Sequence, residues 1–174
     1  MNKPIVNLSE YKEEWESQYE YEKSRIMDVL GDEIVGIEHI GSTSIKGLKA
    51  KPIIDILVGV RDLITVTNFM RPLNKISFEY VHKPELLDRR FFKKGSLETC
   101  TFHLHICEIN SKEWEEKLIF RDYLRKHPQM AKQYASLKTE LASKYTYDRQ
   151  TYTKHKEPFI KYIIEKGRED VYFY

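Results

Sequence analysis

Residues 37–60 read IEHIGSTSIKGLKAKPIIDILVGV, with two apolar, β-branched segments on either side of a polar turn. The first segment, 33–40, is typical of a strand and runs directly into a Gly-Ser-Thr-Ser turn at 41–44. The second segment, 52–60, is almost wholly apolar, which predicts a strand buried on both faces in the middle of a sheet. A sheet built around this second strand is therefore the core that the sequence predicts.

The turn that begins at Gly41 has a composition suited to phosphate binding. A glycine after a strand allows the backbone to turn tightly and lets a ligand approach the amide groups. The hydroxyl groups of Ser42, Thr43 and Ser44 can donate hydrogen bonds to phosphate oxygens. The alternative is a structural turn in which Ser42 or Ser44 caps a following helix.

Asp55 is the acidic residue of the predicted central strand. A carboxylate among aliphatic side chains costs several kcal/mol unless it is paired, hydrogen-bonded or bound to a metal. Two explanations stay open: a structural pair with Lys51 or an arginine, or a role in a metal or phosphate site. Lys51, which lies just before the strand, is also a candidate for phosphate binding.

A second polar pattern occurs in residues 101–107, which read TFHLHIC. With the two-residue period of a strand, His103, His105 and Cys107 share one face and the apolar residues share the other. Two imidazoles at this spacing, about 6.5–7 Å apart at Cβ, can reach one metal ion or one phosphate group. Structural hydrogen bonds are the alternative. The chain has no CxxC or HExxH pattern, which argues against a closed structural zinc site.

Two basic segments are further candidates for ligand binding. In the segment 89–94, RRFFKK, Arg89 and Arg90 lie beside two phenylalanines and could receive phosphate groups, or the segment could be a solvated hairpin. The segment 145–156 combines tyrosines with lysines. Its aromatic rings could stack on a base, or they could pack one helix against another.

The predicted elements divide the chain into two parts of one compact unit. Residues 1–110 form an α/β core with an N-terminal helix, and residues 111–174 form a C-terminal helical part. The predicted helices are 9–30, 61–73, 111–126, 128–145 and 148–167, and the predicted strands are 33–40, 52–60, 77–81, 89–94 and 99–108. We therefore expect an α/β (α+β) fold in which a mixed β-sheet is flanked by helices.

The composition limits the class of protein. The chain has 174 residues, and 29 Lys and Arg nearly balance 27 Asp and Glu, which excludes a polycationic nucleic-acid coat. No apolar run is long enough to cross a bilayer, and the first ten residues contain no apolar leader. Two cysteines are too few for a disulfide scaffold, so a cytoplasmic location is expected. The sequence does not indicate an oligomeric state.

The run 37–56 closely resembles the signature of the GrpB-like family, whose usual pattern is EHIGSTSVPGLAAKPIIDI. The chain departs from this pattern at Ile45, Lys46 and Lys49. That family is assigned to the nucleotidyltransferase superfamily and is sometimes fused to dephospho-CoA kinase. Further matches, which extend the resemblance from the first helix to about residue 166, are His103, Leu104, His105, Tyr152, Lys156 and Phe159.

The resemblance implies a nucleotidyltransferase-like fold with a C-terminal helical part. In that superfamily a Gly-Ser turn after a first strand holds nucleotide phosphates, and the next strand carries a D-x-[DE] pair of metal-binding acids. Gly41 and Ser42 match the turn, and Asp55 matches the first acid. The second acid is replaced by Leu57, which cannot bind a metal.

The third acid of the superfamily comes from a later strand, where this chain offers His103 and His105 instead. One aspartate with two histidines is a poor Mg²⁺ site and a better site for Mn²⁺, Zn²⁺ or Ni²⁺. Glu38 could add a carboxylate if its side chain lies on the same side as Asp55. The residues expected to be catalytic and to bind a divalent metal are therefore Asp55, His103 and His105, converging next to Ser42.

Three functions are compatible with these patterns. The first is a nucleotidyltransferase or phosphotransferase, or a hydrolase of the same bonds, that uses Mg²⁺, Mn²⁺ or another divalent metal. The second is a non-catalytic module that binds a nucleotide or another phosphorylated small molecule and has lost the second acid. The third is an interaction module with a structural polar centre. The residues expected to contact phosphate groups are Gly41, Ser42, Thr43, Ser44, Lys51, Arg89 and Arg90.

Overall fold

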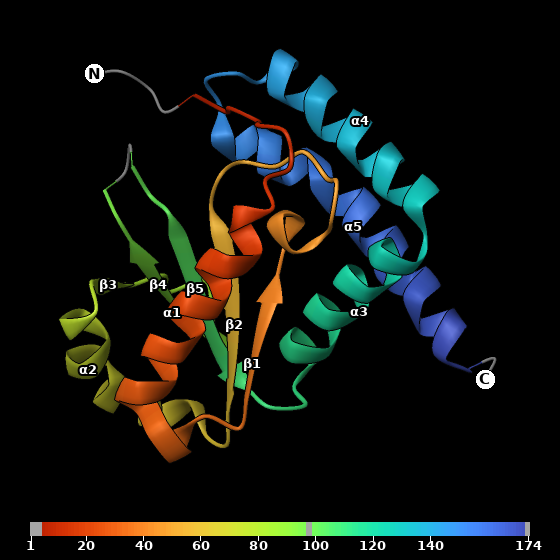
Figure 1. The fold of residues 1–174 in the computed structure, drawn as a ribbon. Coiled ribbons are helices and arrows are strands. Elements are labelled where there is room, and N and C mark those ends of the chain that lie inside the picture. The colour runs from red at the N-terminus through yellow and green to blue at the C-terminus, as the bar shows by residue number, and fades with distance from the viewer. Residues whose placement is uncertain (1–4, 97–98, 173–174) are drawn as a thin grey trace.

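The computed structural model describes residues 5–96 and 99–172 and contains a five-stranded mixed sheet in the order β1-β2-β5-β4-β3 (Figure 1). β2 and β5 pair in parallel, and the other neighbouring strands pair antiparallel. The apolar segment predicted to be central forms β2, which has a partner strand on each side. The strands are β1 Gly36–Ile40, β2 Ile54–Val60, β3 Phe78–Val81, β4 Arg89–Lys94 and β5 Phe102–Glu108.

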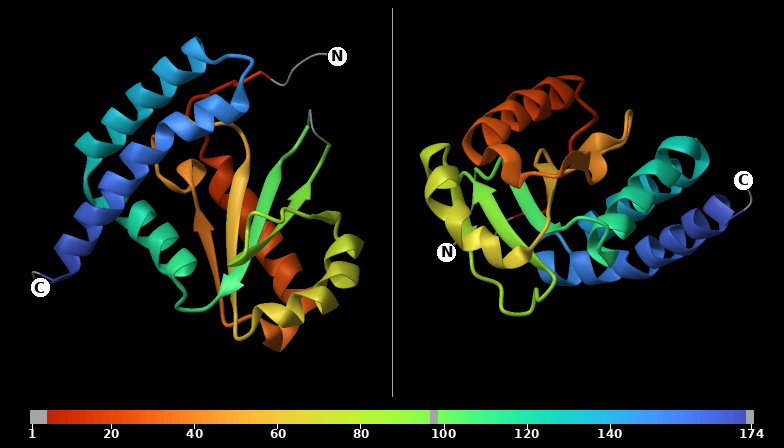
Figure 2. Two further views of the ribbon diagram at one scale, coloured as in Figure 1. Left: turned by 180° about the vertical axis from the view of Figure 1, so that it is seen from behind. Right: turned by 90° about the horizontal axis from the view of Figure 1, so that it is seen from below.

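Helices cover the two faces of the sheet. α1 and α2 lie on one face, whereas α3, α4 and α5 gather on the opposite side (Figures 1 and 2). The fold class predicted from the sequence, a mixed sheet flanked by helices with a C-terminal helical part, is confirmed. The helices are α1 Glu14–Leu30, α2 Met70–Lys75, α3 Lys112–Lys126, α4 Pro128–Lys144 and α5 Arg149–Tyr172, with short 3-10 helices at Gly31–Glu33, Ser42–Ser44 and Leu63–Phe69.

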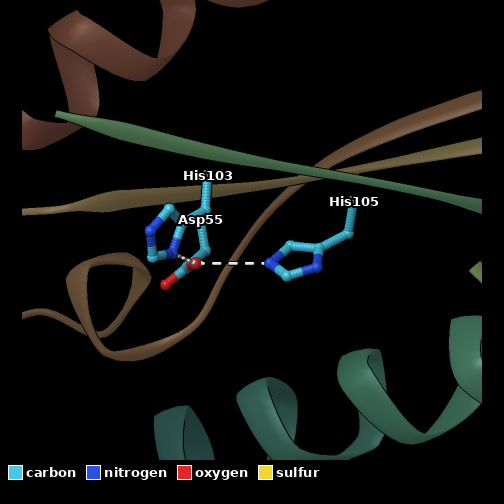
Figure 3. Close-up of side chains that lie close together, drawn as sticks. All are labelled: Asp55, His103 and His105. Atoms are coloured by element: carbon cyan, nitrogen blue, oxygen red, sulfur yellow. Dashed lines mark hydrogen bonds and ion pairs between the residues drawn. The ribbon is translucent and has the colours of Figure 1, made fainter. Parts of the chain in front are cut away.

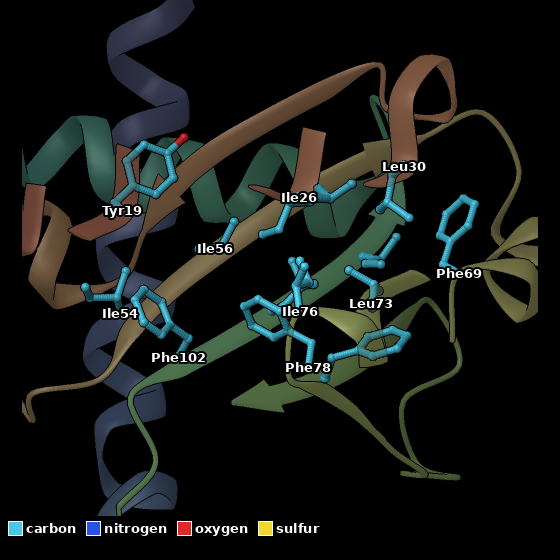
Figure 4. Close-up of a cluster of buried hydrophobic side chains, with 14 of the residues drawn as sticks. Tyr19, Ile26, Leu30, Ile54, Ile56, Phe69, Leu73, Ile76, Phe78 and Phe102 are labelled. Atoms are coloured by element: carbon cyan, nitrogen blue, oxygen red, sulfur yellow. The ribbon is translucent and has the colours of Figure 1, made fainter. Parts of the chain in front are cut away.

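The main hydrophobic core lies between the sheet and the α1–α2 layer (Figure 4). Alternate residues of β2 and β5 point into it, as the two-residue period requires. Ile56 and Leu104 are fully buried there, and α1 and α2 contribute Ile26 and Leu73. Because these apolar residues occupy one face, the intervening polar residues of β2 and β5 lie on the face toward α3.

Some element boundaries differ from the prediction. α1 begins at Glu14 because the backbone of Ser9 pairs with Ala50, where the Ser9 amide donates to the Ala50 carbonyl over 2.9 Å. The predicted helix over 61–73 divides into a 3-10 helix and α2. Pro72 lies in the first turn of α2, where its missing amide has no intrahelical partner to lose. The predicted boundary near residue 110 falls between β5 and α3.

α3 packs directly on the sheet at two glycines that are register partners. A side chain at Gly36 or Gly59 would collide with Trp114, since a Cβ on Gly36 would lie 2.7 Å from the indole Cη2 atom. Trp114 therefore holds α3 against the end of β2 that is far from Asp55. Within the described residues no helix has the length and apolarity needed to cross a membrane.

Candidate functional site

The strand register brings the acid and the two histidines together. Asp55 and His103 are paired across the parallel strands β2 and β5, and His105 lies two residues further along β5 on the same face. The Asp55 Oδ1 atom is 3.2 Å from His103 Nδ1 and 3.5 Å from His105 Nε2 (Figure 3). One ligand atom from each residue lies within 4.8 Å of the other two, so the cluster can hold one metal ion.

The three groups differ in protonation. Burial raises the pKa of the Asp55 carboxyl, but hydrogen bonds from both imidazoles outweigh it and hold that pKa well below its usual range. Burial lowers the pKa of His103, but hydrogen bonds to Asp55 and Cys100 raise it overall to about 9. Burial dominates at His105 and lowers its pKa. At neutral pH the cluster therefore contains a carboxylate, an imidazolium and a neutral imidazole.

The glycine turn lies against this cluster. Gly41 has a φ of 72°, and a Cβ at this position would lie 2.6 Å from Asp55 Oδ2. The Ser44 hydroxyl donates to the Gly41 carbonyl over 2.6 Å, and Arg125 donates twice to the Ser44 carbonyl. The Thr43 hydroxyl is bonded to His39 Nε2 over 2.9 Å. The hydroxyls of Thr43 and Ser44 are thus bonded to β1 and to the turn itself.

The hydroxyl of Ser42 instead lies beside a buried lysine. Lys138 of α4 is 2% exposed, and its ammonium donates to Ser42 Oγ over 3.0 Å and to the Lys49 carbonyl. The ammonium groups of Lys51 and Lys156 are each 4.6 Å from the centre of the Tyr152 ring. These three lysines have no carboxylate within 4.0 Å among residues 5–96 and 99–172.

Burial and mutual repulsion make this lysine cluster unfavourable without an anion. Burial, helped by the charges of Lys156 and Lys51, lowers the pKa of Lys138 to about 7. Burial, Lys156 and Arg149 lower the pKa of Lys51 to about 8. A bound anion would offset both effects, so the cluster (Lys51, Lys138 and Lys156) has the electrostatics of an anion site.

A cavity of about 770 Å³ connects the lysine cluster with Asp55 and the histidines. It lies between the sheet, the glycine turn and the helices α3 to α5. The sequence-predicted residues that line it are Gly41, Ser42, Thr43, Lys51, Asp55, His103 and His105. The structure thus gathers most of the predicted site around one space, while the roles of these residues stay predictions.

Three predicted residues lie outside this lining. Ser44 is buried in the turn. Arg89 pairs with Glu113 of α3, and Arg90 donates to the Arg89 carbonyl over 3.1 Å. Contact of these arginines with a ligand stays a prediction. Two other basic residues of this region do line the cavity, Lys93 of β4 and Lys83 of the β3–β4 connection.

Two further sequence candidates have structural partners. Glu38 lies opposite Leu57, on the same side as Asp55, but its carboxylate accepts a hydrogen bond from Arg121 over 2.6 Å. Cys107 is fully buried beside Trp114. Neither residue belongs to the group of ligand atoms formed by Asp55 and the two histidines.

Sequence reasoning missed Lys138. Its signal is local: it follows Tyr134 by four residues on the buried face of α4, where Leu141 comes next. A lysine on an apolar helix face is unusual because a buried ammonium is costly. The pattern marks the residue as exceptional but does not reveal that Ser42, 96 residues away, is its partner.

Comparison with known proteins identifies the family. A sequence model described as GrpB protein matches residues 5–166. The chain belongs to the GrpB family. It is 38% identical over 170 residues to the glutamate-rich protein GrpB of Alkalihalophilus pseudofirmus, covering 95% of this chain and 98% of that one. It is also 38% identical to the UPF0157 protein YqkA of Bacillus subtilis, of which it spans 47%.

Solved structures support the same fold. The GrpB chain resembles the conserved protein GrpB of Enterococcus faecalis with a TM-score of 0.88 and 35% identity, covering 95% of this chain and 99% of that one. It also resembles the Cid1 poly(U) polymerase with a TM-score of 0.53 and 12% identity, covering 77% of this chain and 42% of that one. The fold is therefore similar to the nucleotidyltransferase fold. One Cid1 structure of similar likeness holds MgGTP.

Proposed function

We propose that this GrpB protein binds a nucleotide or a related phosphorylated small molecule and transfers or hydrolyses a nucleotidyl or phosphoryl group. Asp55, His103 and His105 would hold one divalent metal ion for this reaction. The observation that carries the proposal is the shared cavity, with three metal-ligand atoms within 4.8 Å of one another at one place and the lysine cluster at another. A phosphorylated ligand would use both the metal site and the lysine cluster.

The donor set fits a divalent transition metal. One carboxylate oxygen and two imidazole nitrogens suit Mn²⁺, Zn²⁺ or Ni²⁺ better than Mg²⁺, which prefers oxygen ligands. The Nδ1 atom of His105 is buried without a partner among the described residues, while Nε2 faces Asp55. For Nε2 to act as a ligand, the imidazole proton must reside on Nδ1. His103 must lose a proton before it can coordinate, so metal binding would strengthen as the pH rises.

The chain's own residues would supply the remaining contacts. The ammonium groups of Lys51 and Lys156 would neutralise phosphate oxygens, and the absence of a side chain at Gly41 would let the ligand approach Asp55. A bound divalent metal would polarise a phosphoryl oxygen. The likeness to Cid1 supports a nucleotide as the first ligand class to test.

A non-catalytic binding module is the second candidate. Leu57, at the position of the second metal acid, is fully buried in the packing of α3 on the sheet. No other residue replaces that carboxylate in the cluster formed by Asp55 and the histidines within the described chain. A protein with this cavity could therefore bind a nucleotide without turning it over.

Calorimetry and turnover assays distinguish the two candidates. Mn²⁺, Zn²⁺ and Mg²⁺ are titrated into the protein, and nucleoside triphosphates are then tested for binding and for release of phosphate or pyrophosphate. Asp55→Asn should abolish metal binding and turnover, whereas Asp28→Asn on the exposed side of α1 should leave both unchanged. Nucleotide binding without turnover under every metal would favour the binding module. Absence of both metal and nucleotide binding would reject the proposal.

A further inference from the structure

Ser42 and Lys138 form a pair that the proposed metal chemistry does not use. Ser42 and Lys138 both line the cavity, and the Nζ atom of the buried Lys138 is 3.0 Å from Ser42 Oγ. The Tyr134 hydroxyl also hydrogen-bonds Ser42. A hydroxyl at a ligand cavity with a buried amine within hydrogen-bond distance has the arrangement of a nucleophile and its base.

We propose that Ser42 is a nucleophile and Lys138 its general base, so that the transferred group passes through a covalent adduct on Ser42. The inference deepens the proposed function and rests on it for the substrate class, a phosphoanhydride. One carboxylate and two imidazoles provide a single metal site, whereas two-metal sites stabilise both the attacking and the leaving oxygens. In a covalent route the Ser42–Lys138 pair itself supplies and activates the attacking oxygen of the first displacement.

The surroundings of Lys138 favour the neutral amine that a base requires. The charged groups that face it are the ammonium groups of Lys51, from the loop before β2, and Lys156 of α5, while Tyr134 and Tyr152 are the nearby phenols. Asp55 reaches Lys156 only as a longer-range charge. Burial and the two ammonium groups lower the pKa of Lys138 to about 7. Burial raises the pKa of Tyr134, so its phenol stays protonated and orients the Ser42 oxygen.

The reaction balances without a further reagent. In the first displacement Ser42 Oγ forms a bond to phosphorus, the bond from phosphorus to the leaving phosphate oxygen breaks, and the hydroxyl proton passes to Lys138 Nζ. The leaving phosphate departs as an anion beside Lys51 and Lys156. In the second displacement an acceptor hydroxyl or water attacks the same phosphorus and releases its proton to solvent. Lys138 returns its proton to the Ser42 oxygen as that oxygen leaves.

Diisopropyl fluorophosphate tests the pair without a metal. Ser42 would attack its phosphorus and expel fluoride, leaving a stable phosphoester that peptide mass spectrometry locates. The labelling is carried out on the full chain with a chelator present. We expect labelling at Ser42, with a rate that rises with pH as Lys138 loses its proton.

Variants of α4 provide the control. Lys138→Met should slow the labelling by about a hundredfold or more, the usual contribution of a general base. Lys138→Arg keeps the positive charge but cannot act as a base, so it should be equally slow. Lys132→Met and Lys132→Arg, at an exposed position of the same helix, should label at the wild-type rate. Ser42→Ala should abolish the label, and thermal melting checks that each variant folds.

The outcomes separate this inference from the proposed function. Labelling of Ser42 that depends on Lys138 supports the pair, even if no nucleotide is turned over. Failure to label Ser42, or equal labelling in Lys138→Met, overturns it, and metal-dependent turnover can still stand. A second measurement uses ATP with Mn²⁺ and an acid quench. A phosphoryl or adenylyl adduct on Ser42 supports the inference, and turnover without any adduct contradicts it.

Discussion

At Gly41 a single hydrogen in place of a side chain decides how close the turn comes to Asp55. A Cβ there would lie 2.6 Å from the Asp55 carboxylate, and the φ of 72° also disfavours any other residue. We predict that Gly41→Ala abolishes metal binding and destabilises the fold by about 1–2 kcal/mol. Isothermal calorimetry and urea denaturation measure the two effects.

Gly47→Ala is the matched control for this substitution. Gly47 has a φ of 81°, but a Cβ there would meet nothing within 4 Å. It should therefore share the backbone strain, about 1 kcal/mol, and keep wild-type metal affinity. Equal loss of metal binding in the two variants would mean that strain in the backbone, and not contact with Asp55, explains the effect.

The charge of Asp55 should be visible in the titration of His103. Burial lowers the pKa of His103, but Asp55 and Cys100 together raise it to about 9. In Asp55→Asn burial is opposed by Cys100 alone, so we predict that this pKa falls clearly below the wild-type value. NMR titration of the imidazole signals in metal-free protein measures the shift. A His103 pKa unchanged by the substitution would disprove the ion pair.

At the scale of the elements, β4 and the segment that joins it to β3 carry two basic pairs with different environments. Lys93 is in register with His103, and the Lys83 ammonium is 4.4 Å from the centre of the Phe91 ring beside the histidines. The sequence prediction assigned phosphate contacts to Arg89 and Arg90, which lie outside the cavity lining. The two pairs therefore allow a direct comparison of cations inside and outside the cavity lining.

We predict that Lys83→Gln with Lys93→Gln weakens nucleotide binding at low salt more than Arg89→Gln with Arg90→Gln. Cations at the cavity contribute attraction that salt screens, so the lysine variant should also bind with a smaller salt dependence. Titration at several salt concentrations measures both. A larger effect of the arginine variant would support the sequence prediction for Arg89 and Arg90, and thermal melting checks whether loss of the Arg89–Glu113 pair unfolds that variant.

At the scale of the whole molecule, the features predicted correctly from the sequence are those that depend on local residue patterns. The segment 52–60 identified the central strand, because a short, almost wholly apolar and β-branched run is typical of a strand buried on both faces. The alternation in 101–107 predicted that His103 and His105 share a face, and the register with Asp55 follows once β5 lies beside β2. That strands so distant in sequence are neighbours was implied by the resemblance to a known family, not by any local pattern.

The lysine cluster was beyond sequence reasoning for the same physical reason. Lys51 precedes β2, Lys138 belongs to α4 and Lys156 to α5, so their proximity depends on how the C-terminal helices pack on the sheet. The predicted division of the chain near residue 110 separates Ser42 from Lys138, yet the two form one hydrogen bond. The cavity therefore requires both parts of the chain.

The free energy of unfolding of the whole molecule should depend on pH because Lys138 is buried. Its pKa is lowered from an ordinary 10.5 to about 7, so between these values the unfolded chain binds more protons at this residue than the folded chain. Stability at this site consequently rises with pH, by up to about 1.4 kcal/mol per pH unit. We predict that Lys138→Met is more stable than the wild type at about pH 6 and that this advantage shrinks toward about pH 9. Urea denaturation across that range measures the difference, with Lys132→Met as the control that should follow the wild type. Parallel curves for the wild type and Lys138→Met would show that Lys138 keeps its proton in the folded protein, which would also remove the base from Ser42.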